Sequence, residues 1–325
     1  MDLEAPSSAA MPAYEYFLAG FRIRTQRGGS QQFMETWQAF ILGIIEGITE
    51  YLPISSTGHL VVAQRLMGIG TSEDTKAAAD CFAICIQGGA ILAVLGLYLP
   101  HVLKMANGML GRDPEGFKMA MAILVGFMPA AVLGVLLDDI IEAKLMGIAP
   151  IIAAWVVGGV GILAATGWRK RNPAPGGGKS LLEMTWKMAL VIGLLQCVAM
   201  WPGTSRSLMT IVGGLLVGLS VRAAVEYSFL LGVVTLTAAT AKKAVWKVDA
   251  VADYHHWFGG ARLMWDSYGA LPTVVGLAAA AISAAIAVKW LVSYLQSHGL
   301  AVFGWYRIGI GAVIGGLVLA GVVAA

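Results

Sequence analysis

One stretch of the sequence interrupts an apolar segment with a proline and a run of polar side chains: Glu46-Gly-Ile-Thr-Glu50-Tyr-Leu-Pro53-Ile-Ser55-Ser56-Thr57-Gly58-His59. The apolar segments on either side, at about 38–52 and 55–68, are each shorter than the roughly 17 residues that a membrane-crossing helix needs. Proline breaks a helix, so the chain is expected to turn back between them. Two short apolar helices joined by such a turn are typical of a re-entrant hairpin, which enters and leaves the membrane on one side.

The second half of the chain repeats this pattern at an offset of 149 or 150 residues. A second pair of short apolar segments, at about 186–200 and 204–219, is also split by a proline-containing turn. The sequence therefore predicts two related halves that each carry one hairpin. The matched stretches are Thr36-Trp37 with Thr185-Trp186, Gly43-Ile-Ile-Glu46 with Gly193-Leu-Leu-Gln196, and Pro53 with Pro202.

Composition places these hairpins in a membrane protein. Of the 325 residues, 58% are hydrophobic and only 13% are charged, and the mean hydropathy is +0.75. An average soluble domain is about one quarter charged, so the composition excludes an ordinary soluble enzyme and a disordered chain. Six further apolar segments are long enough to cross a bilayer as helices. They lie at about 81–106, 119–137, 147–167, 223–244, 271–293 and 303–324.

Together the segments predict an all-α polytopic membrane protein with six transmembrane helices and two re-entrant helical hairpins. Each half has one hairpin and three crossings, and since three is odd, the second half must be inverted relative to the first. Inverted repeats with broken helices place a binding site near the bilayer midplane, where the interrupted segments meet. We expect a polar N-terminal arm at 1–35, a first inverted repeat at 36–168, a linker at 169–184 and a second inverted repeat at 185–325.

The charges give an orientation. The net charge of +3 is too small to support nucleic acid as a partner, so we expect none. More Lys and Arg residues fall on the side to which the second hairpin opens, which we therefore expect to be cytoplasmic, with both termini outside. Arg307, near the start of the last apolar segment, is expected to anchor at the lipid headgroups or to pair with a buried carboxylate. The sequence leaves a homodimer open.

Two carboxylates in the first hairpin are candidate functional groups. Glu46 and Glu50 are four residues apart, so on a helix they share one face. At membrane depth two such groups repel each other and are costly to bury. The pair therefore needs a divalent metal ion, a basic side chain or shared protons.

Both turns also carry groups that bind anions. The start of each half-helix has free N–H groups and a partial positive charge that attract phosphate, and hydroxyl groups cap such starts. Arg206 in the second turn adds a guanidinium that suits phosphate oxygens. This convergence predicts a phosphate or diphosphate substrate, and access through the bilayer indicates a lipid-linked one. The other side chains concerned are Ser55, Ser56, Thr57 and His59 in the first turn and Thr204, Ser205 and Ser207 in the second.

The two turns resemble the signature motifs of the bacitracin-resistance type undecaprenyl-diphosphate phosphatases, which are integral membrane enzymes. The resemblance covers nearly all of the chain after the arm. It implies hydrolysis of undecaprenyl diphosphate to undecaprenyl phosphate and phosphate, which recycles the lipid carrier of cell-wall synthesis. It also implies a divalent cation (Mg²⁺ or Ca²⁺) and a location at the outer face of the bacterial cytoplasmic (inner) membrane. Supporting stretches are Ile86-Gln87-Gly-Gly-Ala-Ile-Leu-Ala-Val94, Glu226-Tyr-Ser-Phe-Leu-Leu231 and Tyr306-Arg307.

Position by position, the resemblance implies roles for individual residues. Glu46 and Glu50 would be the catalytic acidic pair and would hold the metal ion. Ser56 or His59 would be the nucleophile or the acid/base group, and the sequence does not choose between them. Arg206 would act in catalysis and also bind phosphate. The remaining phosphate-binding residues would be Ser55, Thr57, Ser205, Ser207 and Thr210.

The chain departs from the usual family pattern near the second turn. Leu208 and Met209 follow the Pro-Gly-x-Ser-Arg-Ser motif, where the family usually has Gly-Ala. We expect these larger side chains to narrow the site or to alter helix packing. Gln196 stands at the position that matches Glu46, so the second half has no carboxylate pair. One alternative function is therefore that of a divergent paralogue acting on another prenyl diphosphate.

A second alternative is a transporter or flippase that moves a polyprenyl phosphate across the bilayer. Inverted repeats with broken helices are also the usual architecture of transporters, so the fold does not decide between the two functions. A carrier needs to recognise an anion but needs neither an acidic pair nor a nucleophile. The carboxylates, serine and histidine of the first turn therefore favour an enzyme.

Overall fold

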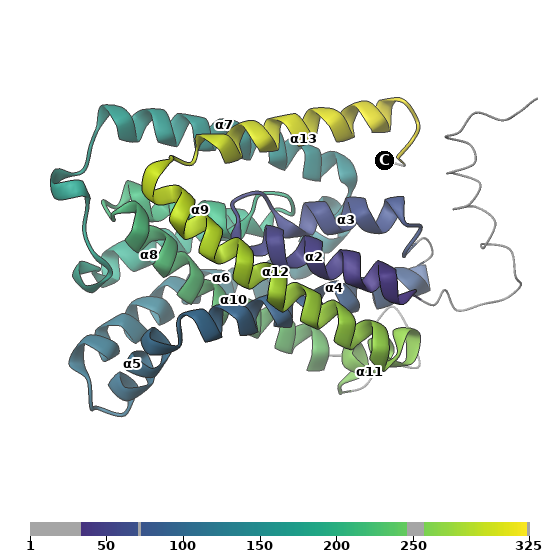
Figure 1. Cartoon of the computed structure of the whole chain (residues 1–325), viewed down its shortest axis with the longest axis horizontal. Helices are drawn as coiled ribbons and strands as arrows, with labels where there is room; N and C mark the ends of the chain where they lie inside the picture. Colours follow the sequence, from purple (N-terminus) through teal and green to yellow (C-terminus); the bar gives the residue numbers. More distant parts are fainter. Residues whose placement is uncertain (1–33, 71–72, 246–256, 324–325) are drawn as a thin grey trace, which may run out of the picture. The chain divides into compact units, whose positions relative to one another are not determined.

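The structure, a computed structural model, describes residues 34–70, 73–245 and 257–323. All regular elements in these ranges are helices, as Figure 1 shows and as the sequence predicts. The expected N-terminal arm at 1–35 lies outside the described residues except for Met34 and Glu35.

Six helices are long and apolar enough to cross a membrane, which confirms the predicted number of spans for the described part of the chain. They are α4 (Glu73–Leu97), α6 (Pro114–Leu145), α7 (Ile148–Arg171), α10 (Val221–Val245), α12 (Ala270–Ser297) and α13 (Ala301–Leu319). Large apolar side chains project outward from these helices, among them Leu92, Val135, Val157, Ile282 and Val313. An apolar surface of this kind requires lipid around it, so the chain is a multi-pass membrane protein.

Besides the hairpins, two shorter α-helices lie between the spans in the described part of the chain. α5 (Leu99–Met109) follows α4 directly, and α11 (Gly259–Tyr268) precedes α12. The expectation of one continuous apolar helix over 81–106 is wrong, because a new helix begins at Leu99 with Pro100 in its first turn. Proline is tolerated in a first turn, where its missing N–H group would have no partner within the helix.

The predicted linker between the halves contains two short 3₁₀ helices, η1 (Pro175–Gly177) and η2 (Leu181–Glu183). Lys179 bonds through its main chain to Gly218 and Ser220, with both N···O distances at 2.9 Å. The linker is therefore attached to the chain that follows the second hairpin. The domain boundaries at 36–168 and 185–325 remain a prediction.

Each hairpin consists of short helices and a tight turn. In the first, α2 (Thr36–Tyr51) is followed by α3 (Ser56–Leu66). α3 and its counterpart in the second hairpin both contain 11 residues, too few to cross a bilayer. These lengths fit the predicted re-entrant hairpins. The helices of the second hairpin are α8 (Trp186–Gln196), the 3₁₀ helix η3 (Cys197–Met200) and α9 (Arg206–Leu216).

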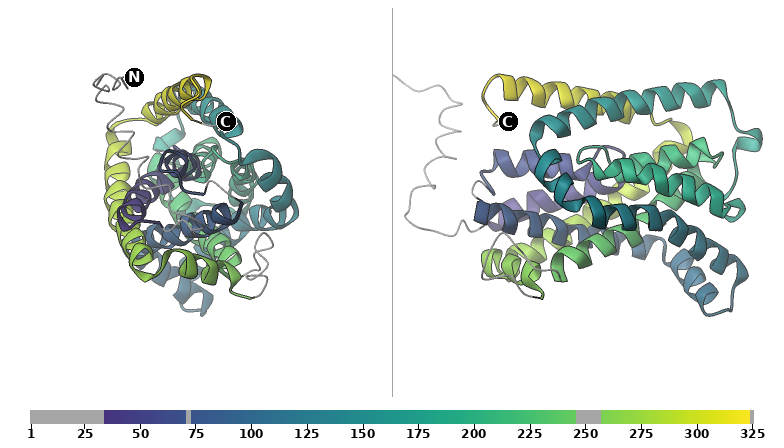
Figure 2. Two further views of the ribbon diagram at one scale, coloured as in Figure 1. Left: turned by 90° about the vertical axis from the view of Figure 1, so that its right-hand side faces the viewer. Right: turned by 180° about the vertical axis from the view of Figure 1, so that it is seen from behind.

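The packing of the helices repeats between the two halves. α2 packs along α12 and α8 packs along α6, while α4 contacts α10 and α7 contacts α13. In Figures 1 and 2 the two hairpins extend in opposite directions from turns that meet near the middle of the helices. This arrangement is compatible with an inverted repeat.

Glycine permits the same close contact in both halves. Gly43 of α2 lies against the main chain of Gly276 in α12, and Gly193 of α8 lies against the main chain of Gly126 in α6. A Cβ atom at Gly43 or Gly193 would overlap the facing carbonyl oxygen. Small residues let membrane helices approach this closely. Each hairpin is thereby packed tightly against one span, and this holds its turn at a fixed depth.

Candidate active site

The two turns have the same backbone conformation. Ser55 and Ser205 precede α3 and α9 with φ angles of 75° and 77°, in a region that serine rarely adopts. Each side-chain oxygen caps its helix by accepting from the N–H group three residues on, Gly58 at 3.4 Å and Leu208 at 3.3 Å. Backbone strain of this kind costs of the order of 1–3 kcal/mol and is concentrated at functional sites. The backbone conformation by itself therefore makes the two turns candidates for a functional site.

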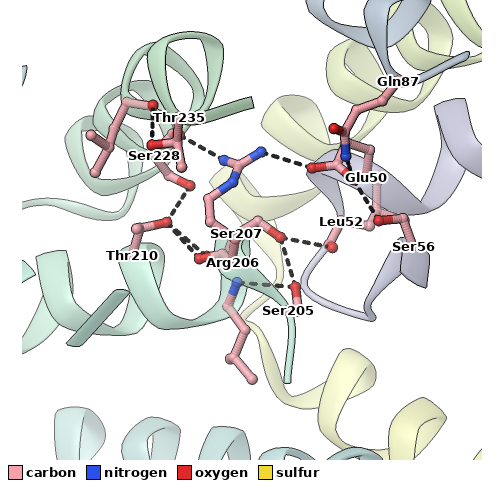
Figure 3. A network of polar contacts seen from close by, with 12 residues as sticks. Glu50, Leu52, Ser56, Gln87, Ser205, Arg206, Ser207, Thr210, Ser228 and Thr235 are labelled. Carbon is pink, nitrogen blue, oxygen red and sulfur yellow. Dashed lines mark hydrogen bonds and ion pairs between the residues drawn. The ribbon is translucent and has the colours of Figure 1, made fainter. Parts of the chain in front are cut away.

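Glu50, buried at the end of α2, is the centre of a polar network (Figure 3). Its Oε1 accepts from Arg206 Nη2 at 3.0 Å, and its Oε2 accepts from Ser56 Oγ at 2.5 Å. Gln87 on α4 donates from Nε2 to Oε2 at 3.4 Å. The structure thus brings together a carboxylate, a hydroxyl and a guanidinium from α2, α3 and α9. A short bond to a carboxylate is the arrangement that activates a hydroxyl as a nucleophile.

Arg206 extends this network into the second half of the chain. Its Nη1 donates to the carbonyl oxygen of Ser228 at 2.9 Å, and its guanidinium lies over the ring of Tyr51 at 5.3 Å from the centroid. The side chain is only 10% exposed, and its Nε is buried without a hydrogen-bond partner. A buried guanidinium with an unused donor can bind a phosphate oxygen.

Glu46 lies one turn before Glu50 on α2. It is 1% exposed, and neither carboxylate oxygen has a hydrogen-bond partner. A buried, unpaired carboxylate is unfavourable, so a proton or a cation must offset its charge. Mg²⁺ commonly takes one or two carboxylates and completes its shell with water and substrate phosphate. The Glu46 and Glu50 pair fits this donor set, and the described residues contain no group of three or more His, Cys, Asp or Glu side chains that could replace it.

His59 lies apart from the Glu50 network. Its Nδ1 is 2.6 Å from the carbonyl oxygen of Ser55, and its Nε2 is 2.8 Å from the hydroxyl of Tyr306 on α13. Since a carbonyl can only accept, Nδ1 carries the proton and Nε2 accepts from the Tyr306 hydroxyl. The ring also lies 5.1 Å from that of Trp155, centroid to centroid. Both ring nitrogens are therefore engaged away from the carboxylates.

The other predicted phosphate-binding residues occupy different environments. Ser205 and Ser207 share a hydrogen bond of 2.9 Å, and Ser207 also donates to the carbonyl oxygen of Leu52 at 2.8 Å. Thr210 is fully buried one turn further along α9, where its hydroxyl bonds within the protein. Thr57 is exposed at the start of α3. Ser205 and Ser207 thus lie at the tip of the hairpin, whereas Thr210 packs behind it.

Three residues have contacts that sequence analysis did not foresee. Gln87 bonds to Glu50 and Tyr306 bonds to His59. A polar amide within an apolar helix is a signal that could have identified Gln87. The expectation for Arg307 is wrong, because this side chain is fully buried and donates to main-chain carbonyls instead of to headgroups or a carboxylate.

Leu208 and Met209 belong to the packing of the second hairpin. Leu208 is 3% exposed and lies in a hydrophobic cluster that includes Tyr51, Ile54 and Ile211. Met209 is partly buried against the same cluster. Both side chains therefore take part in helix packing beside the turn, and their effect on the width of the site stays a prediction.

Comparison with known proteins adds independent information. Residues 39–313 match the model of the family described as "Bacitracin resistance protein BacA". The undecaprenyl-diphosphatase of Sorangium cellulosum is 41% identical over 278 residues, which are 86% of this chain and 85% of that protein. Undecaprenyl-diphosphatase 2 of Rhodospirillum rubrum is 43% identical over 85% of this chain and 93% of its own length. The undecaprenyl-diphosphatase of Azotobacter vinelandii is 41% identical over 86% of this chain and 94% of its own length.

Proposed function

Since this chain belongs to the bacitracin resistance protein BacA family, we propose that it hydrolyses undecaprenyl diphosphate to undecaprenyl phosphate and inorganic phosphate. The reaction returns the lipid carrier of cell-wall synthesis to its monophosphate form. The observation that carries this function is the contact of Glu50 with both Ser56 and Arg206 at the meeting point of the two hairpins. A carrier of lipid phosphates would need the guanidinium but would not need a hydroxyl bonded to a carboxylate.

The diphosphate binds at the starts of α3 and α9. Both starts offer main-chain N–H groups and the positive end of a helix dipole, which favour an anion. Arg206 adds its unpartnered Nε donor, and a charge-assisted bond from it to phosphate would be strong in this buried setting. The prenyl chain stays among the apolar helices, where its burial requires no specific contact.

Ser56 attacks the terminal phosphorus. As its Oγ–P bond forms, the hydroxyl proton passes to Glu50 Oε2, which lies 2.5 Å away. The bond from phosphorus to the bridging oxygen breaks, and the departing undecaprenyl phosphate takes the proton from Glu50. Water then attacks the phosphoserine, and Glu50 transfers a proton from that water to Ser56 Oγ as inorganic phosphate leaves. His59 is the weaker candidate for the nucleophile because both of its ring nitrogens are hydrogen-bonded elsewhere.

Glu46 and Glu50 would hold the divalent cation. When bound, such an ion offsets the charge on the diphosphate during phosphoryl transfer. The two unpartnered oxygens of Glu46 support this assignment. Glu46 would supply the oxygens that have no other partner, whereas Glu50 would contribute an oxygen that also accepts a hydrogen bond, since Arg206 bonds to its Oε1 and Ser56 to its Oε2.

The membrane location follows from the substrate and the charges. We place the protein in the bacterial cytoplasmic (inner) membrane, with the site open to the outer side. The excess of Lys and Arg on the opposite side supports this orientation. Absence of a nucleic-acid partner rests on the small net charge of +3, and a homodimer remains an untested prediction.

A phosphate-release assay tests the proposed function. The purified full-length chain in detergent is incubated with undecaprenyl diphosphate or farnesyl diphosphate, with Mg²⁺, Ca²⁺ or a chelator. The proposal predicts release of inorganic phosphate that depends on the cation and is faster with the longer lipid. Absence of release with any cation, together with movement of labelled undecaprenyl phosphate across vesicles containing the protein, would support the transporter instead.

A further inference from the structure

Arg307 on α13 binds main-chain carbonyl groups. The residue is fully buried, and its guanidinium donates to four carbonyl oxygens. Nη2 bonds to Ala154 and Gly203, both at 2.8 Å, while Nε bonds to Trp155 at 3.3 Å and Nη1 to Pro53 at 3.4 Å. A buried charge in a membrane protein is expensive and normally has a functional reason.

Two of these carbonyl groups occupy equivalent positions in the two halves. Pro53 and Gly203 are 150 residues apart, which is also the separation of the two cap residues Ser55 and Ser205. Each lies two residues before the serine that caps its half-helix, Ser55 or Ser205. One guanidinium therefore bonds to both hairpin tips at the same point of their turns.

The other two carbonyl groups fix Arg307 to a span. Ala154 and Trp155 lie in the first half of α7, and the indole N–H of Trp155 in turn donates to the carbonyl oxygen of Ile54 at 3.0 Å. Space for the guanidinium is provided by Gly158, since a Cβ atom there would overlap its nitrogens. The helix pair of α7 and α13 thus forms a fixed frame from which Arg307 reaches the tips.

The repeat itself does not account for this arginine. At the two offsets of 149 and 150 residues Arg307 corresponds to Gly158 and Val157 of α7, and α7 carries no charged residue before Arg169. Only the second half supplies a guanidinium at this position, and this one group bonds to both hairpin tips. A single shared group makes the position of each tip depend on that of the other.

We propose that Arg307 is a positioning residue that sets the separation of the two half-helix starts between which the diphosphate binds. This role rests on the proposed function, and Arg307 itself touches no reacting atom. A guanidinium is a planar fork that bonds to several acceptors in fixed directions, whereas a lysine ammonium is a compact point charge. Catalysis by positioned groups is sensitive to displacements of about 1 Å, which can reduce the rate by about 100-fold.

The test compares Arg307→Lys, Arg307→Ala, Gly158→Ala and the double variant Gly158→Ala/Arg307→Ala. Arg222→Lys serves as the control, because Arg222 is 72% exposed and pairs with Glu226 on its own helix. For each full-length protein in detergent we measure kcat and KM for undecaprenyl diphosphate and the melting temperature. Arg307→Lys and Gly158→Ala are expected to lower kcat and kcat/KM together by at least ~10-fold with melting temperatures close to that of the unmodified chain. Arg222→Lys is expected to change neither.

The double variant separates positioning from general destabilisation. If Gly158→Ala acts by displacing the guanidinium, it has no further effect on kcat once Arg307 is alanine, so the two effects are not additive. Additive effects, or an unchanged kcat in Arg307→Lys and Gly158→Ala, would overturn the proposal. If Arg307→Ala does not fold, Gly158→Ala and Arg307→Lys decide alone by the same kcat criterion. Failure of the unmodified chain to release phosphate contradicts the proposed function, whereas active variants beside an active parent contradict only the role of Arg307.

Discussion

Arg206 and Glu50 form an ion pair between the two hairpins, with Nη2 of Arg206 3.0 Å from Oε1 of Glu50. The two residues are 156 positions apart in the sequence. Both side chains are nearly inaccessible, with exposures of 10% and 5%. The carboxylate that holds Ser56 and the guanidinium suited to phosphate therefore come from different halves, and neither half alone contains the site.

Substitution of either partner of this buried pair is expected to abolish most of the activity. Arg206→Lys should lower kcat/KM by at least ~100-fold, as loss of a buried donor to a developing charge does. Glu50→Gln should have a comparable effect because it removes the base for Ser56. The pair of Arg222 and Glu226, 2.8 Å apart within α10 and with Arg222 72% exposed, provides the control. Phosphate release by Arg206→Lys at a rate close to that of Glu226→Gln would contradict the assignment.

Glu46→Gln is expected to abolish metal binding without destabilising the protein. Glutamine has the same shape as glutamate, and Gln196 already occupies the equivalent buried position in α8. Since the unpartnered charge disappears, the melting temperature should stay the same or rise. Ca²⁺ and Mg²⁺ should raise the melting temperature of the unmodified chain but not that of the variant, and activity should fall. A variant that still responds to either ion would show that Glu46 is not a ligand, and the exposed Glu115→Gln serves as control.

Ser56 variants test the identity of the nucleophile. Ser56→Ala removes the hydroxyl that lies 2.5 Å from Glu50 Oε2, and kcat is expected to fall by at least ~1,000-fold, as for other enzymes that lose a nucleophile. Ser56→Thr keeps the hydroxyl and should retain part of the activity. The comparison is made with single-turnover kinetics in detergent. If Ser56→Ala keeps more than about one tenth of the parental kcat, Ser56 is excluded as the nucleophile. A tenfold loss of kcat raises the activation barrier by only ~1.4 kcal/mol.

Tyr306→Phe tests whether His59 takes part in proton transfer. The substitution removes the hydroxyl that lies 2.8 Å from His59 Nε2 and leaves the stacked ring in place. Because one neutral hydrogen bond is worth about 1 kcal/mol, kcat is expected to fall by about tenfold or less. A much larger loss of kcat at an unchanged melting temperature would indicate that Tyr306 and His59 transfer a proton in the reaction. That result would contradict the roles given to Ser56 and Glu50.

Leu208→Ala is expected to destabilise the protein. Leu208 is 3% exposed within a continuous hydrophobic cluster, and removal of a buried leucine side chain typically costs about 2–5 kcal/mol. The melting temperature should fall, and turnover of the folded fraction should not rise. Higher turnover without loss of stability would instead indicate that Leu208 narrows the site.

The sequence was sufficient to predict the hairpins and the spans. Pro53 and Pro202 each break an apolar segment, and the hydroxyls that follow provide the caps found at Ser55 and Ser205. Length and hydropathy alone identify the six spans. The helix α5 was missed because its apolar residues continue those of α4, so that Pro100 in its first turn is the one local signal of a break.

The contacts within the site could be predicted only in part. The motif places Glu50 and Ser56 in one turn, but their contact with Arg206 depends on how two distant hairpins dock. His59 follows Ser56 by three residues, yet the packing of Trp155 and Tyr306 directs its ring away from the carboxylates. Contacts with main-chain carbonyl groups, such as those of Arg307, cannot be predicted from the sequence, since every residue has a carbonyl group.

Hydrolysis in water enriched in ¹⁸O tests the central claim most directly. The purified chain is incubated with undecaprenyl diphosphate, and both products are analysed by mass spectrometry beside those of Ser56→Ala and Glu50→Gln. Attack on the terminal phosphorus by Ser56, followed by hydrolysis, predicts ¹⁸O in inorganic phosphate, none in undecaprenyl phosphate, and almost no product from either variant. Appearance of ¹⁸O in undecaprenyl phosphate, or product formation by both variants at the parental rate, would contradict the account.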